Sequence, residues 1–405
     1  TADLTVFGAE RALRSARAIA DDAKTDPFDE AITGLNRAIV GLGEDRKRLE
    51  SLPDSLVAPL AALRDAGHLL MTEIGKDESV EAASRHRAAS AVEEIHDVAG
   101  RLLAAADSDV IWSGGATSTG LHIAPLSVAD EIADRLTEQQ ATVFTSATLT
   151  LGGGFEPLAR ELGLGRALEW SGVDVGSPFD YRKQGILYVA ADLPKPGRDG
   201  LAPETLERMA TLITAAGGRT LVLLSSWRAV DTAGEWLTEQ ELGDFPILIQ
   251  RRGESVARLV SDFIADESSV LVGTMSLFQG VDVPGAACQC VIIDRIPFPR
   301  PDDPVLEARS RNVERAGGSG FAAVSLPRAA LLLAQGAGRL IRTGTDRGVV
   351  AILDPRLASA GYRNFLLKSL PPFWATTNQA TATDALARLT EGTAPAVVAA
   401  AASAG

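Results

Sequence analysis

Cysteine is scarce in this sequence, with two residues in a chain of 405. Cys288 and Cys290 lie two apart in an apolar run. Alternate side chains of a strand share a face, so we expect both thiols to point the same way and to be buried structural groups. A metal site needs further Cys or His ligands, and the histidines show no ligand spacing: His68, His86, His96 and His122. The sequence predicts no metal site, and the scarcity of cysteine fits a reducing cytoplasm.

Long apolar runs are also absent. The longest one near the end of the chain, residues 394–402, is too short to cross a bilayer, so we expect no membrane association. The first four residues, TADL, lack the basic and apolar regions of a signal peptide. They also lack an initiator methionine, which leads us to expect that the natural chain begins upstream. The predicted location is cytoplasmic.

A phosphate-binding loop is the most informative absence. The pattern G-x-x-x-x-G-K-[ST] lets backbone amides and a lysine hold the phosphates of a nucleotide. The single Gly-Lys pair, Gly75-Lys76, is followed by Asp77 and has Leu70 where the first glycine belongs. The pair Asp29-Glu30 opens a helical stripe, whereas a magnesium-binding acidic pair ends an apolar strand. The sequence therefore lacks both elements of a self-contained ATP site.

The composition is that of a globular protein. Hydrophobic residues make up 46 % and charged residues 23 % of the chain. Its length is too great for one compact core, so we expect two or three domains. The formal net charge of −14 argues against a protein coated all over in nucleic acid. It leaves room for a narrow basic groove, because a partner responds to the local field.

Residues 1–106 are predicted to be helical. Three apolar stripes at helical spacing run through them, with charged residues on the faces between. The stripes consist of Ile32, Leu35, Ile39, Leu42 and Leu49; of Leu56, Leu60, Leu63, Leu70 and Ile74; and of Val80, Val92, Ile95, Ala99 and Leu102. Leu52-Pro53-Asp54 separates two helices. Nothing in this region indicates catalysis.

Beyond residue 108 the apolar pattern changes to strands that alternate with helices. The predicted strands are 110–112, 121–123, 141–144, 185–189, 220–224, 246–249, 270–273, 289–294 and 348–353. The predicted helices are 129–136, 203–216, 228–242 and 255–264. This alternation is typical of a parallel sheet in an α/β fold. Ligands of such sheets bind at the carboxyl ends of the strands, where we expect the informative residues.

Short motifs follow these strands in a fixed order. They are 144–149 (FTSATL), 221–227 (LVLLSSW), 272–274 (VGT), 278–285 (FQGVDVPG), 295–299 (RIPFP), 301–304 (PDDP), 335–342 (QGAGRLIR) and 369–373 (SLPPF). The series resembles motifs III to VI of superfamily 2 helicases. The RIPFP, PDDP and SLPPF segments resemble the DinG branch of that superfamily, beside XPD. Each motif alone is weak, whereas the whole series in order is specific.

The resemblance implies that Arg339 and Arg342 are catalytic and reach ATP held by another helicase domain, with Gln335 and Gly338 beside the nucleotide. An arginine finger stabilises charge on the transferred phosphate. The two arginines are three residues apart, so a helical turn would point them the same way. The plain alternative is a solvated pair on a surface helix.

Gly280 and Asp282 resemble the nucleotide-sensing acidic motif of these helicases. The alternative is an ordinary turn, because Asp, Pro and Gly all favour turns. Relatives usually carry Glu before this glycine, whereas this sequence has Gln279, so no role passes to that residue.

Hydroxyls at strand ends suit contacts with nucleic-acid phosphates: Ser225, Ser226 and Thr274. Trp227 either stacks on a base or packs at the start of a helix. By resemblance, Ser146 and Thr148 couple the state of ATP to domain closure, and otherwise they are polar residues that end a strand. Arg182, Lys183, Arg251, Arg252 and Arg347 are further basic residues that line a groove or are solvated surface.

The resemblance implies three parts. Residues 1–106 are a helical arch, 107–168 are the remnant of a first RecA-like domain with motif III, and 169–405 are the second RecA-like domain with motifs IV to VI. The expected fold class is therefore α/β, with a RecA-like parallel sheet preceded by an all-α subdomain and by remnant strands.

The resemblance also implies an activity. The intact protein would move 5′→3′ on single-stranded DNA and unwind forked or duplex DNA in repair and replication, using ATP. ATP and Mg²⁺ would be held mainly by the missing N-terminal RecA-like domain, so this chain alone is expected to be inactive. The four-Cys iron–sulphur cluster of some relatives would lie upstream, and its presence is left open. The alternative is a non-enzymatic module that binds nucleic acid or a partner without hydrolysing ATP.

Overall fold

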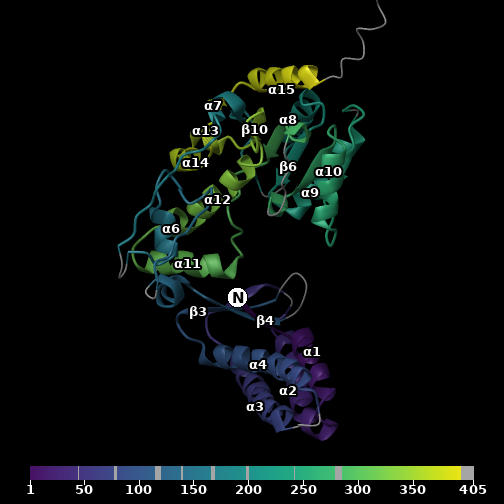
Figure 1. Cartoon of the computed structure of the whole chain (residues 1–405), viewed down its shortest axis with the longest axis vertical. Coiled ribbons are helices and arrows are strands. Elements are labelled where there is room, and N and C mark those ends of the chain that lie inside the picture. Colours follow the sequence, from purple (N-terminus) through teal and green to yellow (C-terminus); the bar gives the residue numbers. More distant parts are fainter. Residues whose placement is uncertain are drawn as a thin grey trace, which may run out of the picture. The chain divides into compact units, whose positions relative to one another are not determined.

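The computed structural model describes residues 1–43, 45–76, 80–114, 120–137, 140–165, 169–197, 200–240, 242–278 and 285–393. The chain forms two compact units (Figure 1). Unit 1 comprises residues 1–134 and 300–324, and unit 2 comprises residues 135–299 and 325–405. The domain boundaries expected at residues 106 and 168 stay predictions.

Unit 1 combines four long helices with a small antiparallel sheet. Its helices are α1 (Val6–Arg17), α2 (Asp22–Val40), α3 (Asp54–Lys76), α4 (Ala82–Ala104), α5 (Ala129–Ile132) and α11 (Pro304–Arg315). Its strands are β1 (Ala2–Thr5), β2 (Lys47–Leu49), β3 (Asp109–Ser113) and β4 (Gly120–Pro125), in the order β1-β4-β3-β2. Helices α2, α3 and α4 form within the predicted apolar stripes, but three stripe residues lie outside them: Leu42, Val80 and Leu49, which is part of strand β2. Strand β1 and helix α1 are elements that the stripes did not indicate.

The antiparallel sheet of unit 1 has a different core on each face. Ile111, Leu121 and Ile123 point into the core of helices α1 to α4. Val110 and Trp112, which alternate with them along β3, pack against Ala308 of α11. The sheet is therefore covered on its second face by a helix that lies nearly 200 residues later in the chain.

Unit 2 is an α/β layer structure. Its strands are β5 (Gly185–Val189), β6 (Thr220–Leu224), β7 (Ile247–Ile249), β8 (Val270–Thr274), β9 (Cys290–Ile293), β10 (Gly348–Ile352) and β11 (Trp374–Thr376). Its α-helices are α6 (Glu156–Glu161), α7 (Tyr181–Gln184), α8 (Pro203–Ala215), α9 (Trp227–Glu239), α10 (Val256–Ala265), α12 (Leu326–Ala337), α13 (Arg356–Ser359), α14 (Arg363–Ser369) and α15 (Gln379–Thr393). Short helical turns are Met275–Phe278 and Gly285–Ala287 (3₁₀), and π-helical turns are Ala133–Thr137 and Phe321–Ser325.

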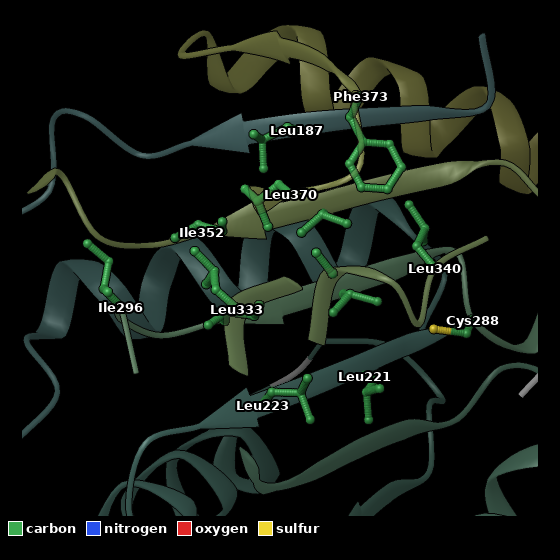
Figure 2. Close-up of a cluster of buried hydrophobic side chains, with 14 of the residues drawn as sticks. Leu187, Leu221, Leu223, Cys288, Ile296, Leu333, Leu340, Ile352, Leu370 and Phe373 are labelled. Atoms are coloured by element: carbon green, nitrogen blue, oxygen red, sulfur yellow. The ribbon is translucent and has the colours of Figure 1, made fainter. Parts of the chain in front are cut away.

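The strands of unit 2 form one seven-stranded parallel sheet in the order β11-β5-β10-β9-β6-β8-β7. Helices α8, α9 and α15 cover one face. Helices α10, α12, α13 and α14 cover the other, where Leu187, Leu223, Leu333 and Ile352 meet (Figure 2). The sequence expectation of an α/β fold with a parallel sheet and a helical N-terminal part is confirmed.

The expected buried strand at residues 141–144 is wrong. This segment has no regular secondary structure, and Val143 is 87 % exposed. A β-branched run forms a strand only where a neighbouring strand pairs with it, and no described residue of this chain does so.

The two cysteines are free and buried as expected, but they do not point the same way. Strand β9 begins at Cys290, so Cys288 precedes the alternating part of the chain. Cys288 belongs to the core beside α12, and Cys290 to the core beneath α8. Burial raises the pKa of Cys288 to about 12, which keeps the thiol protonated.

Candidate functional site

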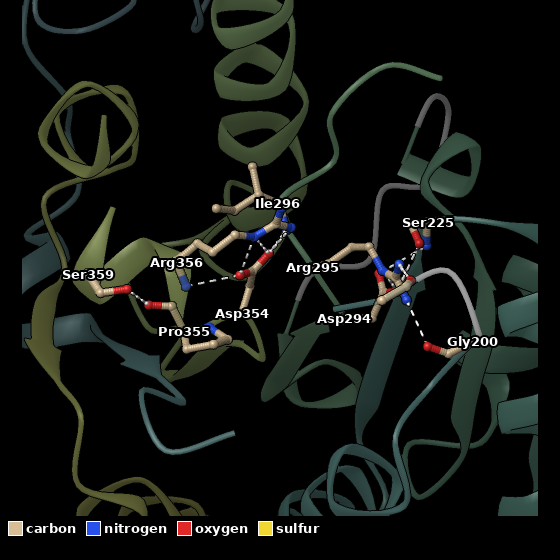
Figure 3. A network of polar contacts seen from close by, with 10 residues as sticks. Gly200, Ser225, Asp294, Arg295, Ile296, Asp354, Pro355, Arg356 and Ser359 are labelled. Carbon is tan, nitrogen blue, oxygen red and sulfur yellow. Dashed lines mark hydrogen bonds and ion pairs between the residues drawn. The ribbon is translucent and has the colours of Figure 1, made fainter. Parts of the chain in front are cut away.

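The carboxyl ends of four neighbouring strands, β6, β8, β9 and β10, bring polar residues to one edge of the large sheet. Ser225 follows β6, Thr274 ends β8, Asp294 follows β9, and Asp354 lies two residues beyond β10. Figure 3 shows two networks of polar contacts, one around Asp294, which includes Ser225, and one around Asp354. Thr274 belongs to neither network and bonds to Gln250.

Asp294 lies at the centre of the first network. Its carboxylate accepts hydrogen bonds from the Ser225 backbone N–H (3.0 Å), from Ser225 Oγ (2.9 Å) and from Arg295 Nε (3.0 Å). The remaining nitrogens of Arg295 donate to the carbonyls of Gly197 (3.2 Å) and Gly200 (3.3 Å). Ser225, predicted to contact phosphate, is thus held in place by a buried carboxylate.

Complete burial raises the pKa of Asp294 above its usual value of 3.8, although Arg295 and the two Ser225 hydrogen bonds act in the opposite direction. The native state therefore keeps a proton on Asp294 at pH values where the unfolded chain has released it. The stability from this carboxyl is fully present below pH 3.8 and is lost as the pH rises through the native pKa.

Asp294→Asn should remove this pH dependence. Since asparagine does not titrate, we expect the free energy of unfolding of the variant, relative to the wild type, to rise from acid to neutral pH. Urea titrations of both proteins across that range measure the difference. A difference that stays constant with pH would show that Asp294 titrates alike in the folded and unfolded chains.

Asp354 organises the second network. Its side chain is fully buried and accepts from the backbone N–H groups of Ile296 (2.9 Å) and Arg356 (3.0 Å). The Arg356 guanidinium donates to both carboxylate oxygens (2.6–3.2 Å), and Asp354 raises the pKa of Arg356. Arg356 also lies 5.6 Å from the centre of the Phe298 ring. One carboxylate thus ties the segment after β9 to the segment after β10.

Thr274 is buried, and its polar groups are engaged inside the protein. Gln250 Oε1 accepts from the Thr274 N–H (2.9 Å) and from its hydroxyl (3.1 Å). The Thr274 hydroxyl also lies 2.6 Å from Ser276 Oγ, and Ser276 is exposed. Gly273 permits this packing, because a Cβ there would lie 2.8 Å from Gln250 Oε1. Ser276, which sequence reasoning missed, is the hydroxyl of this pair that reaches the surface.

Ser226 and Trp227 begin α9. Ser226 caps the helix, since its hydroxyl accepts from the Ala229 N–H (3.1 Å). Trp227 is half-buried, and the Arg252 guanidinium lies 5.6 Å from its ring centre. Both alternatives for Trp227 have a basis here, since one part of the ring is packed and another is exposed beside a cation. Its role stays a prediction.

The arginine motif follows α12, which ends at Ala337 with Gly338 as its C-cap. Gln335 is on the last turn of the helix, whereas Arg339 and Arg342 lie beyond it. The expectation of a helical turn that carries both arginines is therefore wrong. A Cβ at Gly336 would lie 3.2 Å from Ile293 Cδ1, so this glycine lets the helix pack closely on the sheet.

The segment that carries Arg342 lies at the amino edge of the sheet. Asp346 accepts from the backbone N–H groups of Arg342 and Thr343 (both 2.7 Å). Gln184, immediately before β5, donates to the carbonyls of Thr343 (3.0 Å), Gly344 and Asp346 (both 3.2 Å). The arginine motif is therefore on the opposite edge from Ser225, contrary to the expectation that all informative residues follow strands.

Of the remaining predicted residues, the structure describes Ser146 and Thr148. Ser146 Oγ and Thr148 Oγ1 lie 3.4 Å apart in an exposed turn, where Ser146 also accepts from the Thr148 N–H. Gln279, Gly280 and Asp282 lie outside the described residues. The roles of all these residues stay predictions.

Sequence reasoning missed the buried aspartates. Asp294, Asp346 and Asp354 are all buried, and the first two fix the backbone of predicted site residues, Ser225 and Arg342. The sequence offers one signal for them, because Asp294 and Asp354 come directly after apolar strands. An aspartate buried at such a position needs partners, since a carboxylate is rarely buried unpaired.

The described part of the chain has neither a cluster of metal ligands nor a membrane-spanning helix. No group of three or more His, Cys, Asp and Glu side chains there is arranged to hold a metal ion. No helix in the same residues is long and apolar enough to cross a membrane.

Comparisons with known proteins agree with the sequence motifs. Residues 209–373 match the family of the helicase C-terminal domain. The chain is 52 % identical over 314 residues to the ATP-dependent helicase DinG of Mycobacterium tuberculosis H37Rv, covering 75 % of this chain and 47 % of that protein. It is 40 % identical over 262 residues to the ATP-dependent DNA helicase YoaA of Haemophilus influenzae, covering 64 % and 40 %. The chain thus spans about half the length or less of these relatives.

Solved structures show the same fold. A structure titled XPD helicase matches with a TM-score of 0.57 at 16 % identity, covering 93 % of this chain and 65 % of that one. The structure of Xpd4 from S. tokodaii matches with a TM-score of 0.58 at 13 % identity, covering 93 % and 72 %.

Proposed function

Because this chain belongs to the DinG-type branch of the helicases, beside XPD, we propose that it is the C-terminal part of an ATP-dependent DNA helicase. In the intact protein it translocates 5′→3′ on single-stranded DNA and unwinds forked or duplex DNA during repair or replication. Such an enzyme acts on the bacterial chromosome, and we therefore place it in the cytoplasm.

The separation of two sets of residues on the large sheet supports this proposal most directly. Hydroxyls that suit phosphate contacts gather at the carboxyl edge, around Ser225 and Ser276. The segment of Arg342 is fixed at the amino edge by Asp346. A motor needs this division, because it must hold a strand and sense a nucleotide at the same time.

ATP and Mg²⁺ are assigned to an N-terminal RecA-like domain outside this sequence. The residues of this chain do not form a phosphate loop, and no group of His, Cys, Asp and Glu among its described residues is arranged to hold a metal ion. The contribution of this chain is the positive charge of Arg339 and Arg342, which stabilises the γ-phosphate as charge develops on it. Gln335, Gly338, Gly280 and Asp282 complete the proposed nucleotide contacts, and Ser146 and Thr148 couple them to domain closure.

The first test is ATP hydrolysis stimulated by single-stranded DNA, measured for this chain beside the product of the complete gene. We expect turnover by the complete protein alone. Turnover by this chain alone would show that it holds an unrecognised nucleotide site. Absence of turnover in both would favour the non-enzymatic module.

A further inference from the structure

Unit 1 contains a pocket of about 280 Å³ for which the proposed function has no use. It lies between the edge strand β2 and the beginning of α11. On one side the pocket is lined by Lys47 and Arg48 of β2 and by Arg46, which precedes the strand. On the other side it is lined by Glu307 and Arg311 of α11 and by Asp302, which precedes the helix. Three consecutive basic residues in a chain of net charge −14 need a physical explanation.

The sheet fixes the position of Arg48, whereas Lys47 pairs with Ser113 and leaves β2 on the opposite face. Arg48 pairs with Trp112 across β2 and β3, so its side chain lies on the face that α11 covers. The Arg46 guanidinium lies 5.8 Å from the centre of the Trp112 ring. The Nη1 atom of Arg48 is buried and has no hydrogen-bond partner among the described residues. A buried nitrogen of this kind indicates a missing acceptor, such as an ion or a water.

The carboxylates of the pocket are already paired. Arg311 forms ion pairs with Glu50 and Glu307, both at 2.6 Å. Asp302 pairs with Arg300, whose Nε donates at 2.9 Å, and this bond holds the pKa of Asp302 below its usual value with a smaller contribution from Arg46. Within the described residues, Arg46, Lys47 and Arg48 have no ion pair of their own. The pocket therefore has an excess of positive charge.

We propose that this pocket binds a backbone phosphate of a nucleic-acid strand. Arginine donates in a planar fork that matches phosphate oxygens, and a pocket of this volume holds a phosphate with its sugar rather than a whole nucleotide with its base. The amides at the start of α11 are not the binding groups, because Asp303 accepts from the N–H groups of Val305 (3.1 Å) and Leu306 (3.0 Å). The side chains of β2 supply the charge, and the contact does not read base sequence.

The inference rests on the proposed function in one respect, the choice of nucleic acid as the ligand. An acidic protein segment is the competing ligand, and the test separates the two. Lys47 serves as the probe because lysine is rare in this chain, and because Lys24 and Lys76, in the same unit, are ion-paired with Glu73 (3.3 and 2.8 Å).

In the first experiment the full chain is acylated at lysine with and without an oligothymidylate, and the rate at each lysine is read by mass spectrometry. We expect the rate at Lys47 to fall severalfold and the rates at Lys24 and Lys76 to stay unchanged. If the oligonucleotide binds but Lys47 is acylated at the same rate with and without it, the inference is overturned, and the proposed function still stands. Protection of Lys47 by polyglutamate and not by the oligonucleotide would overturn it in favour of a protein ligand.

The second experiment measures the salt dependence of oligothymidylate binding by fluorescence anisotropy. Loss of the phosphate contact in the double variant Arg46→Gln, Arg48→Gln should lower the slope of log K against log [salt] by about 0.7. Arg37→Gln, an exposed arginine of α2, is the matched control and should keep the wild-type slope. An unchanged slope in the double variant would contradict the proposal. If that variant fails to fold, the Lys47 rates in the wild type decide.

Discussion

Replacing Arg342 by alanine in the intact protein should lower the ATP turnover by a factor of roughly 10³ or more while ATP binding is largely kept. The loss falls on the chemical step, because the guanidinium acts on charge that appears only as the γ-phosphate is transferred. Turnover at saturating ATP and single-stranded DNA, together with binding of a fluorescent ATP analogue, measures both quantities.

The structure indicates that this variant will fold. Asp346 accepts from the backbone N–H of Arg342, so alanine preserves this bond that fixes the segment. Arg342→Lys should not restore turnover, because an ammonium lacks the planar fork of the guanidinium. The matched control is Arg388→Ala, an exposed arginine on α15, which should leave turnover unchanged. Normal turnover of the Arg342→Ala protein would remove Arg342 from the proposed mechanism.

Asp354→Ala should lower the free energy of unfolding by about 3–5 kcal/mol, as expected when one partner of a buried ion pair is removed. The variant leaves the Arg356 guanidinium without its carboxylate and the Ile296 N–H without its acceptor. Urea unfolding of this chain, followed by circular dichroism, gives the change. A midpoint equal to that of the wild type would show that solvent replaces the carboxylate at no cost.

Two further variants test the cause of that loss. Asp180→Ala breaks an exposed ion pair with Lys183 (3.0 Å) in the same unit, and it should leave the midpoint unchanged. The double variant Asp354→Ala, Arg356→Met should recover part of the stability, because it removes the unpaired charge as well. If the double variant is as unstable as the sum of the single variants, the two side chains act independently.

The parallel sheet was predictable because its strands are short apolar runs separated by helices. Strands β5, β6, β8, β9 and β10 occur within one or two residues of their predicted bounds, because nearly every residue of these strands is buried. The segment 141–144 has the same composition, but the prediction of a strand there was wrong. A strand also needs a neighbouring strand to pair with, and a local sequence pattern does not reveal one.

The candidate site was predictable in part. Motif order pointed to Ser225 and Arg342 as candidates, but it did not reveal that they lie on opposite edges of the sheet. That arrangement depends on the segment after α12, because Gly336 still packs against Ile293 at the carboxyl end of β9, whereas Asp346 holds Arg342 before β10. The sequence did not identify Asp294 and Asp354 as buried residues of the site, because an aspartate after an apolar run also suits an ordinary turn. Their importance comes from complete burial, which only the fold shows.

The discontinuous build of unit 1 has a consequence for synthesis on the ribosome. Trp112 and Val110 are made early, but the helix that covers them, α11, ends at Arg315, about 180 residues after the first segment of unit 1 ends at Asp134. At ordinary rates of synthesis this delay lasts roughly 10–40 s. Throughout that interval one face of the small sheet has no cover, while five strands of the large sheet are being made. The part of the protein that is synthesised first is thus completed late.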